Sequence, residues 1–96
     1  MISCSYRADL GMLTIDGHAG YAPKGQDIVC AGVSALEIAL ASWLTVNEIP
    51  HKSVIGESET DVIRCQDERA RPCFEMVWQG LKAMANSYPD YVCVGG

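Results

Sequence analysis

The stretch from Cys30 to Leu44 constrains the fold most, because its fifteen residues contain a single charged side chain, Glu37. A membrane-spanning helix needs roughly 20 apolar residues, so we interpret this shorter stretch as the core helix of a globular domain. Apolar residues recur there at steps of four and three, which is the spacing of one helical face. The predicted stripe consists of Val29, Val33, Leu36, Leu40 and Trp43.

Residues at both ends of this pattern predict where the helix starts and stops. Asp27 is a residue type that caps helix N-termini, and Pro50 cannot continue a helix, so we expect the helix to run from about Asp27 to Ile49. On a helical wheel, Cys30 shares a side with Ser34 and Glu37, beside the apolar stripe and outside it. The Cys30 sulfur is therefore expected to be accessible.

The remaining segments predict strands around one further helix. Residues 1–7 and 12–17 alternate between apolar and polar and are joined by the turn-like residues 8–11, which indicates an antiparallel hairpin. Residues 18–26 form a glycine-punctuated loop, residues 53–65 hold one or two strands of open register, and residues 66–72 form a charged loop. Residues 87–94 supply a turn and the last strand. The second helix follows Pro72 and shows one apolar face made of Phe74, Val77, Trp78, Leu81, Met84, Ala85 and Tyr88.

This pattern predicts an α+β fold in a small single domain spanning residues 1–96, with two amphipathic helices packed on a mixed or antiparallel β-sheet. The chain has 12 acidic and 7 basic residues, a net charge of −5, and no run of basic residues, which argues against direct nucleic-acid binding. A basic protein or peptide is a plausible partner. The first residues, MISCSYRADL, lack the features of a signal peptide, so we expect a cytoplasmic location with no membrane association.

The cysteines argue against a metal site. The five of them form no CxxC pair and no cluster with His18 or His51, whereas a structural zinc site usually takes four ligands in short-spaced pairs. We therefore expect no metal and no other cofactor. Four of the thiols are interpreted as free, small, buried or half-buried hydrophobic residues: Cys4, Cys65, Cys73 and Cys93.

Cys30 differs because it lies in the first turn of the predicted helix. Unpaired backbone N–H groups and the helix dipole favour an anion there, so a thiol at that point loses its proton more readily than usual. A nucleophilic thiolate also needs a base, and the nearest imidazole in the sequence is His18, twelve residues upstream across a flexible loop. Asp27 or Asp16 could orient that imidazole, and the helix-terminal N–H groups could hold an oxyanion.

Spacing alone does not establish this pair. A cysteine and a histidine twelve residues apart occur by chance in many small proteins, and His18 could simply close a turn. Ser34, four residues after Cys30, is more often a helix-surface residue than a participant in chemistry.

The stretch GHAGYAPKGQDIVCAGVS, Gly17 to Ser34, resembles the ribosomal-processing cysteine protease family, Prp, of Firmicutes and relatives. The resemblance extends to Leu81 and to YPDYV at residues 88–92, while the chain is shorter than typical members between about His51 and Cys73. It implies that His18 and Cys30 are the catalytic dyad, that Asp27 and Ser34 support the active site, and that the substrate-binding loop includes Gly17, Gly20, Tyr21 and Gly25.

The resemblance also implies a substrate and an assembly. Members of the family remove a short hydrophobic N-terminal extension from the precursor of large-subunit ribosomal protein L-twenty-seven through an acyl-enzyme, and they are typically homodimers with a mobile loop between the His and the Cys. We expect loop closure over the bound peptide to bring the imidazole to the sulfur.

Three alternatives remain open from the sequence. The chain could be a phage-type protease that processes a capsid or scaffold protein with a similar cleavage site. It could be a non-catalytic peptide-binding module in which Cys30 only caps a helix, or a thiol redox sensor, although no resolving cysteine lies nearby in the sequence. The sequence does not identify a third catalytic residue.

Overall fold

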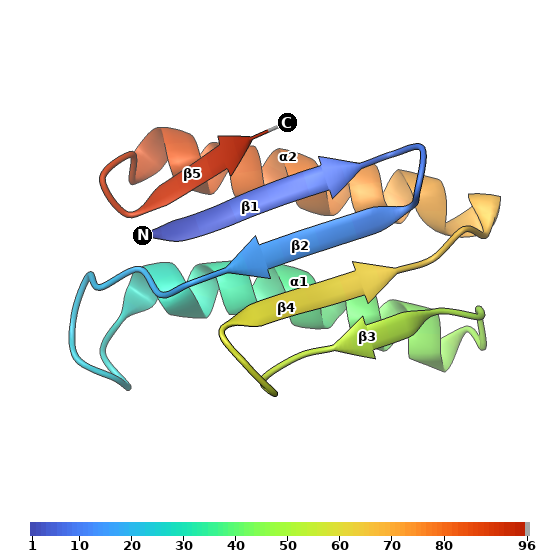
Figure 1. The fold of residues 1–96 in the computed structure, drawn as a ribbon, viewed down its shortest axis with the longest axis horizontal. Helices are drawn as coiled ribbons and strands as arrows, with labels where there is room; N and C mark the ends of the chain where they lie inside the picture. The colour runs from blue at the N-terminus through green and yellow to red at the C-terminus, as the bar shows by residue number, and fades with distance from the viewer. Residues whose placement is uncertain (96) are drawn as a thin grey trace.

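A computed structural model describes residues 1–95 as one five-stranded sheet with two long helices on a single face (Figure 1). The strands lie in the order β3-β4-β2-β1-β5, with β1 and β5 parallel and the other neighbours antiparallel. The predicted α+β fold with a mixed sheet is therefore confirmed. In chain order the elements are β1 (Ile2–Arg7), β2 (Met12–Asp16), α1 (Ile28–Val46), β3 (Lys52–Val54), β4 (Thr60–Arg64), the 3-10 helix η1 (Glu68–Ala70), α2 (Arg71–Ser87) and β5 (Val92–Gly95).

The predicted hairpin is present, with Cys4 opposite Ile15 and Tyr6 opposite Leu13. The alternating pattern sets which face of each strand is buried, because successive side chains point to opposite faces of a sheet. Ile2, Cys4, Leu13 and Ile15 face the helices and are buried. Residues 53–65, whose register the sequence left open, form two strands, and β4 pairs with β2 in the middle of the sheet.

The predicted stripe of α1 is partly wrong. Val29, Val33 and Leu40 are buried as expected, but Trp43 is 38% exposed and Leu44 is fully buried in its place. Glu37, expected beside the stripe, is also buried. The buried side is thus rotated slightly from the predicted stripe, because α1 covers the sheet and α2 at once (Figure 1).

The end of α1 also differs from the prediction. The helix stops at Val46, ahead of Pro50, because Asn47 caps it and Glu48 takes a left-handed backbone conformation with φ of 54°. The Ile49 N–H then donates to the Leu44 carbonyl, and the Ile49 side chain returns to the core. Pro50 therefore does not end the helix, because the chain has already turned at Asn47 and Glu48.

The predicted charged loop at residues 66–72 is wrong from Glu68 onward. Asp67 caps η1, and α2 begins at Arg71 with Pro72 in its first turn, where a missing N–H is tolerated. Phe74, Val77 and Leu81 are buried on the predicted face of α2. The two helices approach closely where Gly32 meets the Met84 side chain and Gly80 meets the Leu36 side chain.

α1 is the one helix within residues 1–95 that is long and apolar enough to cross a membrane by length and composition. Its buried side chains pack against the sheet and α2 of the same chain, as expected for a core helix.

Candidate active site

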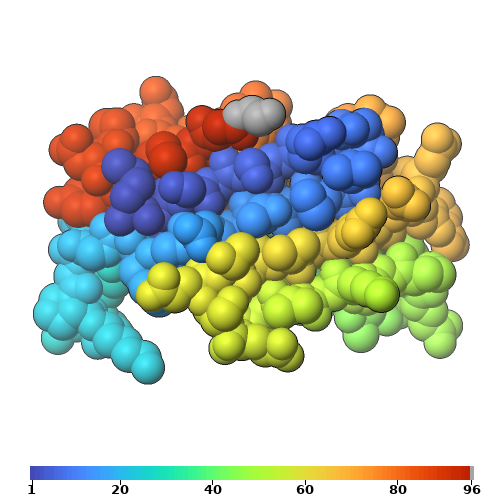
Figure 2. All heavy atoms as spheres, in the orientation of Figure 1, coloured from blue at the N-terminus to red at the C-terminus, as the bar shows by residue number. Residues whose placement is uncertain are grey.

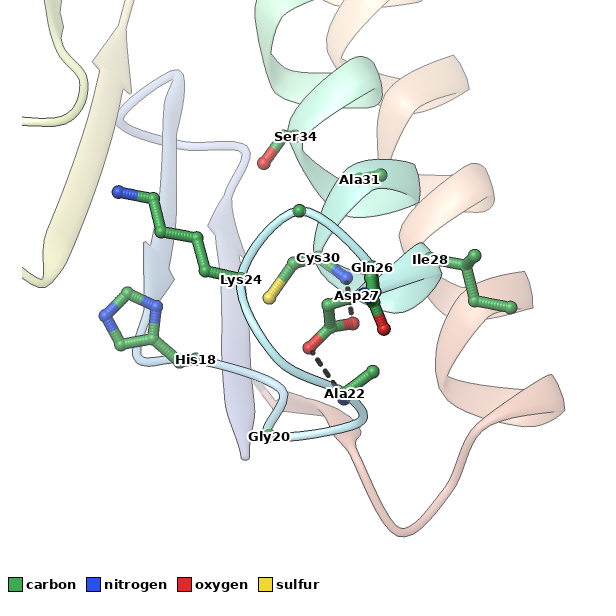
Figure 3. A pocket seen from close by; sticks show the side chains of 11 residues that line it. His18, Gly20, Ala22, Lys24, Gln26, Asp27, Ile28, Cys30, Ala31 and Ser34 are labelled. Carbon is green, nitrogen blue, oxygen red and sulfur yellow. Dashed lines mark hydrogen bonds between the residues drawn. The ribbon is translucent and has the colours of Figure 1, made fainter.

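A cavity of about 690 Å³ opens between the first turns of α1 and the loop that follows β2 (Figure 3). In Figure 2 this loop projects from one end of the molecule. The cavity brings together six residues singled out from the sequence and five others, in chain order His18, Gly20, Ala22, Lys24, Gly25, Gln26, Asp27, Ile28, Cys30, Ala31 and Ser34.

Asp27 joins the loop to the helix. Its Oδ1 accepts hydrogen bonds from the N–H groups of Val29 and Cys30, at 3.0 and 2.9 Å, which confirms the predicted N-cap. Its Oδ2 accepts from the N–H of Tyr21 at 3.1 Å. The Cys30 N–H, with the loop amides, holds the pKa of Asp27 below its ordinary value. The carboxylate is thereby held mainly by backbone donors, and the Cys30 side chain also lowers its pKa.

Cys30 presents its sulfur to the cavity. The side chain is half-buried, and Sγ accepts a hydrogen bond from the Ala19 N–H at 3.4 Å. Figure 3 shows the sulfur directed away from α1, toward the side on which His18 lies. Because the Val29 and Cys30 N–H groups donate to Asp27, they are not free to hold an oxyanion, whereas the Ala19 N–H donates to the Cys30 sulfur.

His18 follows the last residues of β2 and is exposed at the rim of the cavity. Its carbonyl accepts a hydrogen bond from the Met1 amino group at 2.6 Å. The residue before it, Gly17, has φ of 89°, and a Cβ there would lie 2.5 Å from the Met1 carbonyl oxygen. A side chain at this position would strain the backbone and crowd the close crossing of the two chain segments.

No hydrogen bond joins the His18 ring to the Cys30 sulfur within residues 1–95. Neither candidate for orienting the imidazole is bonded to it in that part of the chain. Asp27 accepts from backbone amides, and the Asp16 Oδ1 accepts from the Thr60 hydroxyl at 2.5 Å. The structure thus places the two side chains of the predicted dyad at one cavity without joining them.

Tyr21 and Gly17 do not line the cavity. Tyr21 instead packs edge-on against the rings of Tyr88 and Tyr91, with ring centroids 5.9 and 5.1 Å away. Those two tyrosines belong to the YPDYV segment between α2 and β5. The loop is therefore attached at Tyr21 and Asp27, while its glycines and Lys24 lie over the cavity (Figure 3).

The sequence reasoning missed the roles of the Ala19 N–H and the Met1 amino group, because backbone donors leave no sequence signal. It also missed two apolar lining residues, Ile28 and Ala31, which flank Cys30 on α1. Exposed apolar residues in the helical turn that carries Cys30 were a usable signal for a hydrophobic binding surface.

The other cysteines differ from Cys30 in their surroundings. Cys4 and Cys65 are buried and Cys73 is half-buried, as expected, but Cys93 is exposed, so that part of the prediction is wrong. Burial raises the pKa of the Cys4 thiol to about 11, and the Cys65 thiol donates to the Pro50 carbonyl. Residues 1–95 contain no group of three or more His, Cys, Asp or Glu side chains placed to hold a metal ion.

Comparison with known proteins gives a consistent result. The family model described as "Cysteine protease Prp" matches residues 1–93. The protein "Ribosomal processing cysteine protease Prp" of Mycoplasma pneumoniae is 33% identical over 86 residues, covering 83% of this chain and 81% of the relative. Its namesake in Mycoplasma genitalium is 30% identical over 83 residues, covering 85% of this chain and 84% of that protein.

Solved structures share the fold. The Staphylococcus aureus ribosomal processing protease Prp with a covalently linked product peptide has a TM-score of 0.78 at 18% identity, covering 98% of this chain and 95% of that one. A Streptococcus mutans protein has a TM-score of 0.71 at 25% identity, covering 97% and 89% of the two chains.

Proposed function

Since the chain belongs to the Prp family of cysteine proteases, we propose that Cys30 is its nucleophile and His18 the general base that activates it. The observation that carries this assignment is the cavity itself. It holds one thiol and one imidazole, and the sulfur already accepts an N–H hydrogen bond from Ala19.

The proposed reaction follows from this arrangement. His18 takes the thiol proton, and the Cys30 sulfur bonds to the carbonyl carbon of the scissile peptide. The Ala19 N–H, which lies next to the sulfur, donates to the oxyanion of the tetrahedral intermediate. The C–N bond breaks as His18 returns the proton to the leaving amine, and water then attacks the acyl-enzyme to release the second product and the free thiol.

The open geometry supports a closing step. His18 is exposed and unbonded to Cys30 within residues 1–95, and the loop between them is attached at Tyr21 and Asp27. We propose that an extended peptide in the cavity draws Gly20 to Gly25 over itself and brings the imidazole to the sulfur. Such closure limits cleavage of peptides that do not fill the cavity.

We propose that the substrate is the precursor of ribosomal protein L-twenty-seven, cut after its hydrophobic N-terminal extension. Three features support this choice. The Mycoplasma relatives carry the name of ribosomal processing proteases, the cavity wall includes the apolar side chains of Ala22, Ile28 and Ala31, and a net charge of −5 suits a basic ribosomal protein.

A cleavage assay with matched variants tests the proposal. A peptide spanning the extension and its junction is incubated with the wild type, with C30A and H18A, and with two controls that change the same residue types elsewhere, C93A and H51Q. We expect kcat to fall by about 1000-fold or more in the first two variants and to stay within about twofold in the controls.

Other outcomes point to the alternatives. Tight binding of a peptide that stays intact with the wild type indicates a binding module. Cleavage of a capsid or scaffold junction in preference to the ribosomal one indicates a phage-type protease. Selective, reversible oxidation of Cys30 by peroxide without peptide cleavage indicates a redox sensor.

We further propose that the enzyme acts as a homodimer in the cytoplasm, where ribosomal precursors are made. The outward side of α1 supports the dimer, because it carries no charged side chain and exposes Ile28, Ile38, Trp43 and Val46. Light scattering tests the assembly: I38E should yield monomers, while the exposed apolar residue of α2 changed in M76E should leave the mass unchanged. Cell fractionation tests the location.

A further inference from the structure

Glu37 is a buried acid in the middle of the helix that carries the nucleophile. The residue is 4% exposed, and no other Asp, Glu, Lys or Arg among residues 1–95 is buried. A carboxyl group without water must be neutral or must find a compensating partner. Within residues 1–95, no fully buried side-chain nitrogen or oxygen lacks a hydrogen-bond partner.

The partner of Glu37 is another acid, Asp61 on β4. Asp61 pairs with Ile15 in the sheet, and the residues one step further along on the same face, Ile63 and Leu13, are buried beneath the helices. The Asp61 side chain therefore faces α1, and burial first, then a hydrogen bond with Asp61, raises the pKa of the Glu37 carboxyl. Two carboxyl groups can form such a bond only when one of them carries a proton.

The surroundings offer no cation to replace that proton. From β1 the ionisable group near Glu37 is the Cys4 thiol, which is neutral, and β2 presents the apolar Ile15. Burial, reinforced by Asp61, raises the pKa of Glu37 to about 8. The charged residues of the other packed elements are exposed: Lys52 on β3, Glu57 and Glu59 in the β3–β4 turn, and Arg71, Glu75 and Lys82 on α2.

The acid pair is connected to both halves of the active site. Glu37 lies on α1, seven residues after Cys30. On the other side, β4 begins beside the end of β2. The Thr60 hydroxyl donates to Asp16 at 2.5 Å, and the Gly17 N–H donates to the Glu59 carbonyl at 3.0 Å. The next residue along the chain is His18.

We propose that Glu37 is a positioning residue whose proton, shared with Asp61, holds α1 against the start of β4 and so sets the placement of Cys30 relative to His18. The inference rests on the proposed function, in which these two side chains react together. Asp61 also accepts from the Gly56 N–H at 2.9 Å, so the same carboxyl anchors the β3–β4 turn. Loss of the proton leaves two facing carboxylates, which repel each other and move the helix off the strand.

The sign of the pH effect follows from the raised pKa. Between the ordinary value of 4.5 and about 8 the folded chain holds a proton that the unfolded chain releases, so stability falls as pH rises through this window and levels off above it. Activity should fall at the upper end, near pH 8, where the folded enzyme itself loses the proton.

The decisive variant is E37Q, whose amide donates to Asp61 at every pH. We expect its kcat near neutral pH to stay within about threefold of the wild type, and the loss of kcat near pH 8 to disappear. Its melting temperature should no longer fall between pH 5 and 8. E37L, which cannot form the bond, should lose about tenfold in kcat with little change in KM.

The exposed glutamate on α2 provides the control, since E75Q should leave both pH profiles unchanged. Identical kcat and melting profiles for wild type and E37Q would overturn the proposal. An altered melting profile with an unchanged kcat profile also overturns it, because the pair would then be only structural. Failure of the proposed dyad is recognised separately, by a C30A enzyme that still cleaves the peptide.

Discussion

The two cavities at opposite ends of β2 differ in chemistry more than in form. The one after β2 holds Cys30 and His18, has a volume of about 690 Å³, and pairs few of its side chains with each other. The one before β2, about 380 Å³, lies among Asp9, Asp67, Glu68 and Arg71. There two of the three acids are already neutralised, Asp9 by Arg7 and Asp67 by Arg69.

This contrast indicates which of the two cavities can support a chemical reaction. In the second cavity Asp9 and Asp67 are paired with nearby arginines, and the thiol at its wall, Cys65, is buried and donates to a carbonyl. In the first cavity the carboxylate of Asp27 accepts from backbone amides, the half-buried Cys30 sulfur accepts from the Ala19 N–H, and the His18 ring makes no hydrogen bond within residues 1–95. Equivalent substitutions in the two cavities, one at each end of β2, should therefore have different effects.

The largest difference between the two cavities should be the rate at which their thiols are alkylated. We expect iodoacetamide to modify Cys30 about 1000-fold faster than Cys65, because Cys65 is exposed only when the chain opens. Mass spectrometry of tryptic peptides over time measures both rates, with exposed Cys93 as a reference for an ordinary surface thiol. Equal rates for Cys30 and Cys65 would contradict the contrast.

Two of the five glycines with positive φ within residues 1–95, Gly11 and Gly17, should separate stability from activity. A Cβ on Gly11 would lie 1.8 Å from the Cys65 carbonyl oxygen, so G11A should lower the free energy of unfolding by about 2–4 kcal/mol. G17A meets the Met1 carbonyl at 2.5 Å, and the exposed first residue can move aside, so about 1–2 kcal/mol is expected. Because Gly17 precedes His18, G17A should also reduce kcat by about tenfold.

Urea unfolding and cleavage assays measure these changes. The comparison fails if G11A loses more activity than its loss of folded protein explains, or if G17A retains full kcat.

Removal of the two helix-capping aspartates, Asp27 and Asp67, should give a smaller difference in stability than the two glycine substitutions. Asp27 caps a helix of 19 residues and also holds the loop, whereas Asp67 caps the three residues of η1. We expect D27A to lower the melting temperature by roughly 5 °C and D67A by about 2 °C or less. Loss of activity should accompany D27A alone, since it releases the loop at Tyr21 and the first turn at Cys30.

The acid dependence of these aspartates follows from their depressed pKa values. Stabilisation by Asp27 is present above its ordinary pKa of 3.8 and is lost as pH falls through the lower folded value. For Asp67, which Arg69 holds at a pKa of about 2, the loss occurs between 3.8 and about 2. Melting curves of wild type and both variants from pH 7 downward test this, and parallel curves for wild type and D67A throughout would contradict it.

The surface ion pair of Arg7 and Asp9 should have the smallest effect on stability and activity. Their side chains are 52% and 63% exposed, and exposed pairs contribute little because water and salt screen them. R7A should shift the melting temperature by less than about 2 °C and leave cleavage unchanged. A larger loss that persists in 1 M salt would show that the second cavity depends on this pair.

Local patterns predicted most of the elements correctly. Alternation in residues 1–7 and 12–17 specified the hairpin and its buried face, and the capping geometry of Asp27 was readable because N-caps depend on residues close in sequence. The mistakes arose where distant segments compete. Leu44 displaced Trp43 from the core because α1 packs on the sheet and α2 together, and Glu68 to Ala70 formed a short helix where charge alone suggested a loop.

The candidate site shows the same division. The sequence singled out His18, Gly20, Gly25, Asp27, Cys30 and Ser34, which now share one cavity. It did not indicate that Tyr21 would pack on Tyr88 and Tyr91, or that the Ala19 N–H would donate to the sulfur. Those contacts join separate segments of the chain, and no local sequence pattern predicts that the segments lie side by side.

By itself the sequence determined which residue types are present and their local order: a thiol in the first turn of a capped helix, an imidazole after a strand, and a glycine-punctuated loop between them. The tertiary structure decided what each group faces. Glu37 has the same helical spacing as a surface residue, yet it is buried against Asp61 because the direction in which α1 lies on β4 is set by packing across the whole core. Burial, and with it the balance of charge and proton, is a property of that assembled core and not of any segment within it.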